Sequence, residues 1–234
     1  AQAYYQQKDY KNALATTDRL VKSGQRPSED VLQLMLRSSY ELKDAEGTAR
    51  ALESLLKFYP SPDTWSRVLA GYIEQTNHDH ELLALYRLSE NVGALTKDTQ
   101  FIDMSQALVV SGFGIEAQRI MEKGIADGLF QGEDMTRAQR TLDAAKRKAD
   151  VQRKALAGAD QALAAAKTGD AAYEVGKMRK AIATPGLSES DDAHELLGIA
   201  LARQSKNAEA AKAFDGVKDP KYAEVARLWK LHLR

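Results

Sequence analysis

Apolar residues recur along most of this chain at the spacing of an amphipathic helix. Leu32, Met35, Leu36, Ser39 and Tyr40, for example, fall on one side of a helix with about 3.6 residues per turn. No stretch alternates apolar and polar residues over the length of a β-strand. The prolines lie between the periodic segments, where helices begin and end: Pro27, Pro60, Pro62, Pro185 and Pro220. The pattern predicts an all-α fold.

A layout of one large and one small residue repeats along the chain. A large residue is followed nine positions later by alanine in four pairs: Tyr4 and Ala13, Tyr40 and Ala49, Leu108 and Ala117, Leu201 and Ala210. Tyr72 fits the large position, but Glu81 stands where the alanine would be. Because alanine lets two helices approach closely where they cross, the layout predicts stacked helix hairpins with polar turns such as "QKD" and "SGFG".

Several segments resemble the tetratricopeptide repeat. Residues 193–214, "AHELLGIALARQSKNAEAAKAF", have its signature spacing. The signature positions are Leu197, Gly198, Leu201, Ala210 and Phe214. Residues 65–72 and 104–125 resemble further parts of such units, and the distance from Tyr4 to Tyr40 is 36 residues, near the roughly 34 of this repeat. The runs "LLKFYPSPDTW", "GIEAQRIMEKGIADG", "LLGIALARQ" and "ARLWKL" are similar to exported bacterial tetratricopeptide proteins.

The resemblance implies a right-handed superhelical solenoid of antiparallel helix hairpins, located in the bacterial periplasm or exported. We expect tetratricopeptide-like repeats over residues 1–130 and a long charged helical segment, of one or two helices, over 131–168. Degenerate and C-terminal units should follow over 169–218, and a capping helix over 219–234. That last helix carries its apolar face on Tyr222, Val225, Leu228 and Trp229. An exposed docking helix is the alternative interpretation.

Two places depart from a regular array. Tyr4 should lie in the middle of a first helix, so we expect the chain to begin inside a repeat unit of a longer protein. No full first helix precedes Gly169 and Asp170, which resemble an inter-helix turn. That unit is therefore either degenerate, or residues are missing near 168–172.

The composition narrows the function. There are no cysteines, which excludes disulfides, thiolate metal sites and cysteine nucleophiles. With 33 basic and 33 acidic residues the formal net charge is zero, which argues against a dedicated nucleic-acid binder. No apolar run approaches the roughly 18 residues of a membrane span. No phosphate-binding loop is present, because "SGFG" at 111–114 follows no strand. We therefore expect no cofactor.

Three polar segments are candidates for chemistry, and each has a structural interpretation that we favour. In "NHDHE", residues 77–81, the histidines lie two apart, whereas helical metal pairs prefer a spacing of four, so we expect exposed turn histidines. We expect His194 to be a packed structural residue. In "SESDDAHE", residues 188–195, we expect Ser188 or Ser190 to cap a helix and the acids of the next turn to complement its dipole. The sequence predicts no catalytic residue and no metal site, and hence no enzyme.

The resemblance also implies a concave groove, lined by first helices, that binds a peptide or a protein. Carried over position by position, the groove residues are Tyr5, Gln6, Leu34, Ser38, Glu41, Ser66, Arg67, Ala70, Ile73, Ile102, Gln106 and Val109. These residues are small, apolar or amide-bearing with few charges, which suits an extended or helical peptide. The alternative is that several of them pack on a neighbouring helix. The lysine and asparagine clamp that the family uses for C-terminal carboxylates is not seen at these positions.

One segment has a strong excess of basic residues. Residues 137–154 hold seven basic residues against two acids. The basic stripe consists of Arg137, Arg140, Lys146, Arg147, Lys148, Arg153 and Lys154. A solvated helix accounts for it, but such a stripe can also contact an anionic polymer, an acidic partner or a membrane surface. The alternative function is therefore an accessory module of an envelope export or polysaccharide-secretion machine that contacts an anionic partner.

Overall fold

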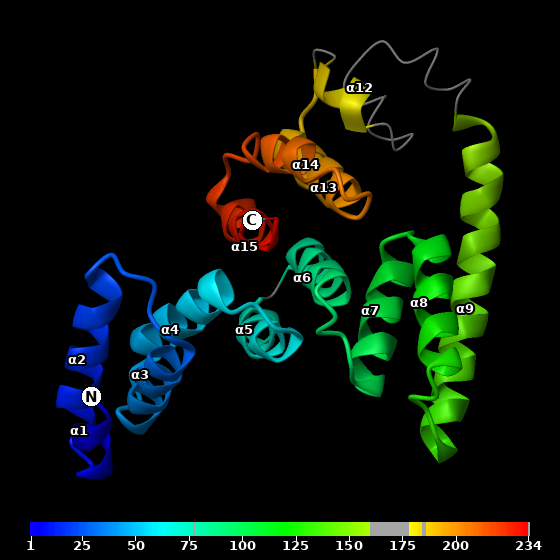
Figure 1. Cartoon of the computed structure of the whole chain (residues 1–234). Coiled ribbons are helices and arrows are strands. Elements are labelled where there is room, and N and C mark those ends of the chain that lie inside the picture. Colours follow the sequence, from blue (N-terminus) through cyan, green and yellow to red (C-terminus); the bar gives the residue numbers. More distant parts are fainter. Residues whose placement is uncertain (77, 160–177, 184–185, 234) are drawn as a thin grey trace. The chain divides into compact units, whose positions relative to one another are not determined.

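The computed structural model describes residues 1–76, 78–159, 178–183 and 186–233. Within these ranges the chain is helical throughout, with no strand, so the predicted all-α class is confirmed (Figure 1). The chain divides into two compact units, Ala1–Gln75 (unit 1) and Thr76–Arg234 (unit 2), which are described separately. None of the described helices is both long enough and apolar enough to cross a bilayer.

Unit 1 is a series of helices packed in chain order. It contains α1 (Gln2–Gln6), α2 (Tyr10–Lys22), α3 (Glu29–Glu41), α4 (Ala45–Phe58) and α5 (Pro62–Gln75). Four of these helices begin at a side-chain cap of the expected kind. Ser61 accepts a 3.1 Å hydrogen bond from the Thr64 N–H at the start of α5. Asp9 accepts a hydrogen bond from the backbone of Asn12 at 3.2 Å, Ser28 from Val31 at 3.4 Å, and Asp44 from Gly47 at 2.9 Å.

The core of unit 1 is aliphatic. Leu32, Met35 and Leu36 of α3 are buried, and so are Leu55 and Leu56 of α4. Each of α2, α3 and α4 packs against the next helix in the chain. The apolar periodicity of the sequence thus becomes a continuous stripe of contacts along the unit.

The predicted register of the second hairpin is wrong. Tyr40 is 56% exposed and Ala49 is exposed as well, so this pair does not form the helix crossing. The small residue at the crossing is Gly47, where an added Cβ would contact Ser39 Oγ and the Asp44 carboxylate. The expected pairing does match the burial of Leu108 with Ala117 and of Leu201 with Ala210.

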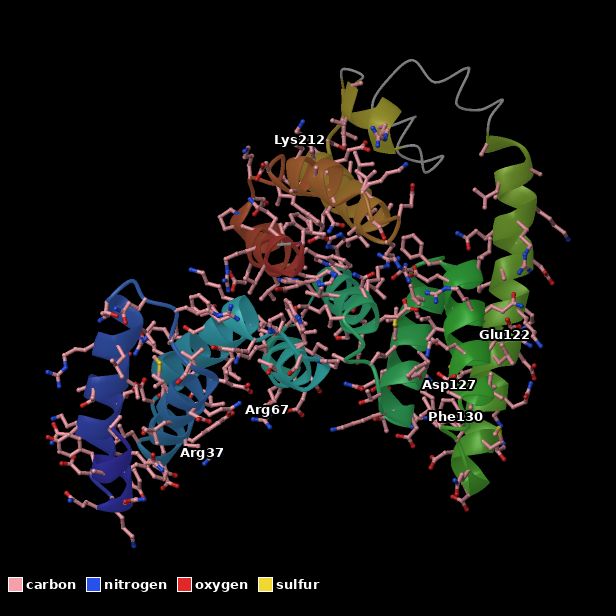
Figure 2. All side chains as sticks on the ribbon, in the orientation of Figure 1. Arg37, Arg67, Glu122, Asp127, Phe130 and Lys212 are labelled. Atoms are coloured by element: carbon pink, nitrogen blue, oxygen red, sulfur yellow. The ribbon has the colours of Figure 1, made fainter. Side chains whose placement is uncertain are left out.

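Unit 2 begins with four helices and ends with a second group nearer the C-terminus. The first group is α6 (Asp79–Asn91), α7 (Asp98–Val110), α8 (Gly114–Ala126) and α9 (Gly132–Ala157). The second group is α12 (Met178–Ala183), α13 (Ser190–Ala202), α14 (Asn207–Phe214) and α15 (Pro220–His232). Long charged side chains such as Glu122 and Lys212 extend from these helices into solvent (Figure 2).

The charged segment forms one 26-residue helix, α9, over Gly132–Ala157. Residues 160–168 of the predicted 131–168 segment, and the predicted irregularity near 168–172, lie outside the described residues. The helix packs on α8 through a narrow face of small residues, because Gly114 lies directly against the backbone of Lys148 and Ala149. Gln152 Oε1 accepts a hydrogen bond of 2.9 Å from the Ile115 N–H and so caps the start of α8.

The last helix, α15, packs on both helices of the preceding hairpin, α13 and α14. Val225, Leu228 and Trp229 are fully buried, and the Trp229 ring stacks on Phe214 with the ring centres 6.0 Å apart. It also packs against α6, which the repeat pattern did not predict. Trp229 Nε1 donates a 3.2 Å hydrogen bond to the Ala84 carbonyl, 145 residues earlier in the chain. The C-terminal helices therefore return to the start of unit 2.

Candidate functional site

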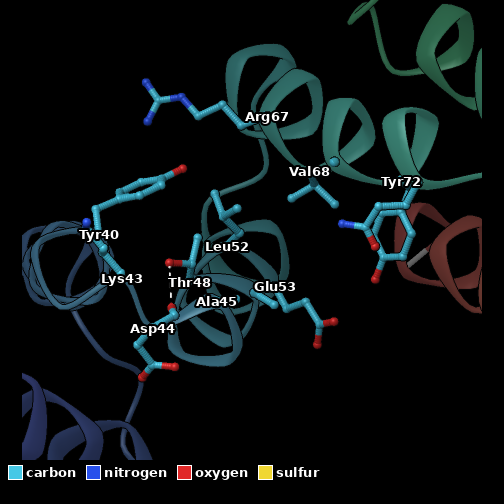
Figure 3. Close-up of a pocket in the computed structure, with 13 residues that line it drawn as sticks. Tyr40, Lys43, Asp44, Ala45, Thr48, Leu52, Glu53, Arg67, Val68 and Tyr72 are labelled. Atoms are coloured by element: carbon cyan, nitrogen blue, oxygen red, sulfur yellow. Dashed lines mark hydrogen bonds between the residues drawn. The ribbon is translucent and has the colours of Figure 1, made fainter.

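Unit 1 contains a largely apolar cavity of about 500 Å³ between α3, α4 and α5. Its walls include Tyr40 at the end of α3, Leu52 on α4, and Val68 and Tyr72 on α5 (Figure 3). Cavities of roughly 300–1,000 Å³ accommodate small ligands or anchoring side chains. The cavity also explains why an aromatic ring as large as Tyr40 is more than half exposed, since this ring lies at the cavity's edge.

Polar groups at the rim of the cavity fix its shape. Asp44 caps α4 through its side chain, and its carbonyl accepts a 2.9 Å hydrogen bond from Thr48 Oγ1 (Figure 3). Lys43 links α3 to α4 in a left-handed conformation, with φ of 54°. On the other side, Arg67 pairs with Asp63 one turn earlier on α5, at 2.9 Å. The site is thus a preformed apolar hollow with a charged rim.

The groove residues predicted from the repeat belong partly to unit 1 and partly to unit 2. Of that set, Arg67 lines the cavity. Ser38 is fully buried and donates a 2.8 Å hydrogen bond to the Leu34 carbonyl, and Ile102 is 1% exposed, so neither is available to a partner. The packing alternative is correct for these two. Tyr5, Gln6, Leu34, Glu41, Ser66, Ala70 and Ile73 belong to unit 1, whereas Gln106 and Val109 lie on α7 of unit 2.

The seven basic-stripe residues are all exposed on α9. Arg153 donates hydrogen bonds to Asp150 at 3.0 Å and to Gln118 at 2.8 Å, and Arg137 lies 4.0 Å from Asp103. Exposed ion pairs of this kind contribute little to stability, and they leave the cationic groups accessible to solvent. The stripe therefore presents its positive charge outward.

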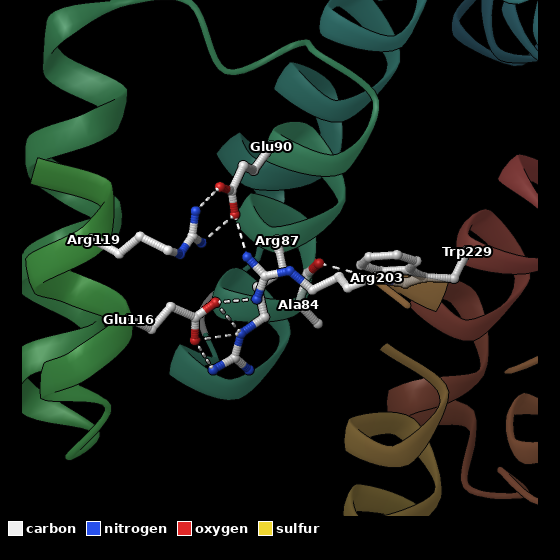
Figure 4. A network of polar contacts seen from close by, with 7 residues as sticks. All are labelled: Ala84, Arg87, Glu90, Glu116, Arg119, Arg203 and Trp229. Carbon is white, nitrogen blue, oxygen red and sulfur yellow. Dashed lines mark hydrogen bonds and ion pairs between the residues drawn. The ribbon is translucent and has the colours of Figure 1, made fainter. Parts of the chain in front are cut away.

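A network of arginines and glutamates joins three helices of unit 2 (Figure 4). The buried Arg87 of α6 donates hydrogen bonds to Glu116 of α8, the shortest of them 2.7 Å from Nη2. Arg203, just beyond α13, donates to the same carboxylate at 2.5 Å and also to Glu90 of α6. Arg119 of α8 binds Glu90 from the other side at 2.5 and 2.8 Å. The charges alternate, so each carboxylate contacts two cations.

This network fixes the arrangement of α6, α8 and α13. Burial acts to raise the pKa of Glu116, but the Arg87 and Arg203 guanidinium groups outweigh burial and hold the pKa below its ordinary value. Arg87 also lies over the Phe113 ring, 4.5 Å from its centre. A partly buried charge network adds less stability than its contacts suggest, because desolvation offsets the attraction. It does destabilise any other packing of these helices, because the charges would then be buried without their partners.

The polar segments chosen from the sequence have mixed outcomes. His194 is a packed structural residue, as predicted, with its ring against Gly216 and Nδ1 2.8 Å from the Ser190 carbonyl. His78 is exposed, also as predicted. His80 is not an exposed turn residue: it lies in the first turn of α6 and contacts Asp192 and Glu195. No local signal could reveal this contact, because its partners are far away in the chain.

Asp191 and Asp192 lie in the first turn of α13, as expected for residues that complement the helix dipole, but neither Ser188 nor Ser190 is the N-cap residue. The N-cap residue of α13 is Glu189, whose side chain makes no capping hydrogen bond. Asp191 instead accepts hydrogen bonds from the backbone of Lys218 and Asp219 at the start of α15, the latter at 3.1 Å. Asp192 and Glu195 are buried.

In comparisons with known proteins, no protein-family model matches the chain and no curated protein sequence is similar to it. The relation to tetratricopeptide proteins therefore stays a prediction from the sequence.

Proposed function

We propose that the chain is a non-catalytic scaffold that binds a peptide or protein segment, and that the cavity of unit 1 holds the segment's anchoring side chain. The observation that supports this proposal is the preformed hollow of about 500 Å³ lined by Tyr40, Leu52, Val68 and Tyr72. An aromatic or aliphatic residue inserted into such a hollow gives the kind of buried contact that dominates binding energy. A right-handed superhelical arrangement of the hairpins, as in tetratricopeptide proteins, is part of the same proposal.

The rim suggests how the segment is oriented. Lys43 and Arg67 bring positive charge to the rim, and Asp44 and Glu53 bring negative charge. A rim of mixed charge favours an amphipathic peptide with an apolar anchor and polar flanks over a uniformly charged polymer. The binding requires no cofactor.

Gly71 offers a sharp test, because it lines the cavity and a Cβ added there meets nothing within 4 Å. We expect Gly71→Leu to fill part of the cavity without disturbing the fold. A displayed library of random peptides is selected on the wild-type chain, and the affinities of the selected peptides are then measured on the variants. Gly71→Leu should weaken their binding at least about tenfold, which is roughly 1.4 kcal/mol.

Gly71→Ala is the matched control, because it changes the same backbone position but leaves most of the cavity open. It should bind the selected peptides as the wild type does. The proposal is wrong if no peptides with an apolar anchor are enriched, or if the enriched peptides bind Gly71→Leu at full strength.

The exposed stripe of α9 favours a second candidate function, an accessory role in envelope export or polysaccharide secretion through an anionic partner. Arg140, Lys146 and Lys148 have exposed cationic side chains on this helix. Binding to heparin, used as a polyanion probe, should then weaken steeply between low and physiological salt and fall on charge removal at these three positions. Peptide binding in the apolar cavity should show little dependence on salt.

We also propose that the protein works in the bacterial periplasm or is exported. This proposal is based on the resemblance to exported tetratricopeptide proteins. Fractionation of cells that express the natural gene, with antibody detection of the protein, tests it, and recovery in the cytoplasmic fraction alone would contradict it.

A further inference from the structure

Three potential metal ligands meet where side chains of α13 reach the start of α6. His80 lies in the first turn of α6. Asp192 and Glu195 are three residues apart on α13 and so share one face of that helix. One ligand atom from each of the three lies within 4.8 Å of the other two. This cluster is separate from the cavity of unit 1.

The two carboxylates are buried without the hydrogen bonds that burial normally demands. Glu195 is 0% exposed, and neither of its oxygens has a hydrogen-bond partner among the described residues. The Asp192 side chain is 10% exposed, and its Oδ1 likewise has no hydrogen bond there. Buried polar groups in native proteins are nearly always satisfied, and an isolated buried carboxylate is costly. Apart from the contact with His80, the described residues supply no positively charged partner for these oxygens.

Neighbouring cations do not supply that partner. Arg87 is close enough to act on Glu195 electrostatically, but its Nε and Nη2 bind Glu116. His80 is the direct contact: its Nε2 touches Asp192 Oδ1 and lies 3.2 Å from Glu195 Oε2. A singly charged imidazolium balances one carboxylate and leaves the second uncompensated. A neutral imidazole with two carboxylates would balance a divalent cation.

We propose that His80, Asp192 and Glu195 bind a divalent transition-metal ion, with Zn²⁺ as the best match to one nitrogen and two oxygen ligands. Around a tetrahedral zinc with ligand bonds near 2 Å, neighbouring ligand atoms lie roughly 3.3 Å apart. The separation of His80 Nε2 and Glu195 Oε2 matches this value. Asp192 and His80, which are in closer contact, must move apart slightly to admit the ion.

The surroundings favour a site with limited access. The Tyr222 ring stands perpendicular to the His80 ring, with the ring centres 4.7 Å apart, and covers one side of it. The His80 side chain is 27% exposed, which leaves a route from solvent. Three protein ligands leave at least one position of a four-coordinate ion for water. The bound ion would link α6 directly to α13 and so fasten the C-terminal helices to the start of unit 2.

Zinc titration of the whole chain tests the proposal. The chain is purified without an affinity tag, stripped of metal with a chelator, and titrated with zinc chloride by calorimetry, with thermal unfolding recorded in parallel. We expect one ion to bind per chain and the Tm to rise with zinc concentration, because the ion binds the folded state. Manganese and magnesium chloride serve as harder, oxygen-preferring ions, and both should bind more weakly.

Substitutions locate the site. His80→Ala, Asp192→Asn and Glu195→Gln should each weaken zinc binding by more than about tenfold. His78→Ala is the matched control, because His78 is exposed two residues from His80 and should not affect binding. Helical circular dichroism confirms that each variant is folded, and Glu195→Gln, which conserves shape, keeps the test valid if His80→Ala unfolds.

The proposal is overturned if the wild-type chain shows no saturable binding at millimolar zinc. It is also overturned if His78→Ala loses binding while Glu195→Gln keeps it, because the ligands would then lie on the surface turn. Neither result would bear on peptide binding by unit 1.

Discussion

The two units of this chain are stabilised by different kinds of interaction. In unit 1 the contacts run from each helix to the next, and the buried polar residues are hydroxyl-bearing: Thr17, Ser38, Ser39 and Thr64. In the described part of the chain, the buried charged residues are Arg87, Asp192 and Glu195, and all three belong to unit 2. Unit 2 is also joined by contacts such as Arg203 to Glu90, 113 residues apart.

This difference separates two ways of building a helical protein. Apolar stripes between adjacent helices tolerate a change of register, since any aliphatic residue of suitable size fills the space. Buried charges tolerate almost none, because a charge moved from its partner loses both its pairing and its hydration. Unit 1 is therefore suited to a binding surface that varies, and unit 2 to one fixed arrangement.

The largest effect should come from the tryptophan that joins both ends of unit 2. Trp229→Ala removes a fully buried ring and its hydrogen bond to Ala84, and it should lower the free energy of unfolding by about 4 kcal/mol. Hydrogen exchange measured by mass spectrometry should accelerate in α6 and α13–α15. Equal acceleration in α3 and α4 would contradict the division into two units.

The ionic difference between the units can be tested with one arginine from each. Arg87→Met leaves Glu116 with Arg203 alone and should cost about 3 kcal/mol in urea unfolding, because it removes a buried partner. Arg50→Met in unit 1 removes exposed pairs with Asp44 and Glu46 and should change stability by no more than about 0.5 kcal/mol. If the two substitutions lower the free energy of unfolding by similar amounts, the two units do not differ in their dependence on ion pairs.

Glu195 should make the stability of metal-free unit 2 depend on pH. Burial raises the pKa of Glu195 from 4.5 to about 7, with the negative charges of Asp192 and Glu81 adding to this effect and with His80 and Arg87 opposing it. The folded state therefore holds this proton more tightly than the unfolded state does. The resulting stability is complete below about pH 4.5 and is lost as the pH rises through 7.

His80 acts in the same direction. Burial alone would lower the pKa of its imidazole, but the contacts with Asp192 and Glu195 outweigh burial and raise the pKa. With a chelator present, the wild type should lose roughly 2–3 kcal/mol more stability than Glu195→Gln between pH 5 and pH 8. If the free energy of unfolding falls by the same amount with pH in the two proteins, Glu195 does not titrate as proposed.

The smallest effects should come from two glycines of unit 1 that differ in their surroundings. Gly71→Ala meets open space within a helix and should stabilise the chain by about 0.5–1 kcal/mol. Gly47→Ala brings the same gain in intrinsic helix propensity, but its methyl group would collide with Ser39 Oγ and the capping Asp44. We expect a net loss of stability at Gly47 in thermal unfolding, and a gain there would show that α3 and α4 can separate freely.

Local features of the fold were predictable from the sequence. The helical period placed Leu32, Met35 and Leu36 in the core, and the described prolines lie just before a helix or at its first residue. Gly112 lies in the polar turn "SGFG" that the repeat pattern predicted, and it adopts a left-handed conformation with φ of 84°. Each of these depends on a few neighbouring residues, so the pattern contains the necessary information.

The candidate sites could not be predicted in the same way. Tyr40 follows the same helical period as Leu36, yet one is exposed and the other buried, because the position of the next hairpin decides which side of α3 is covered. His80 and Glu195 become neighbours through side chains that extend from α6 and α13 toward each other. A single sequence has no local signal for a contact between distant helices, so the sequence predicts an exposed histidine and acids that only complement a helix dipole.

The hydrogen bond from Trp229 to Ala84 has a consequence for the order of folding. During synthesis, α6 leaves the ribosome 145 residues before the ring that will cover it. Closing a loop of that length costs roughly 4 kcal/mol of chain entropy beyond a constant term, about twice the cost for a loop of about ten residues. Unit 1 can fold while the rest of the chain is being translated, whereas the aliphatic face of α6 must wait for α15. In that interval α6 is the surface most in need of a chaperone.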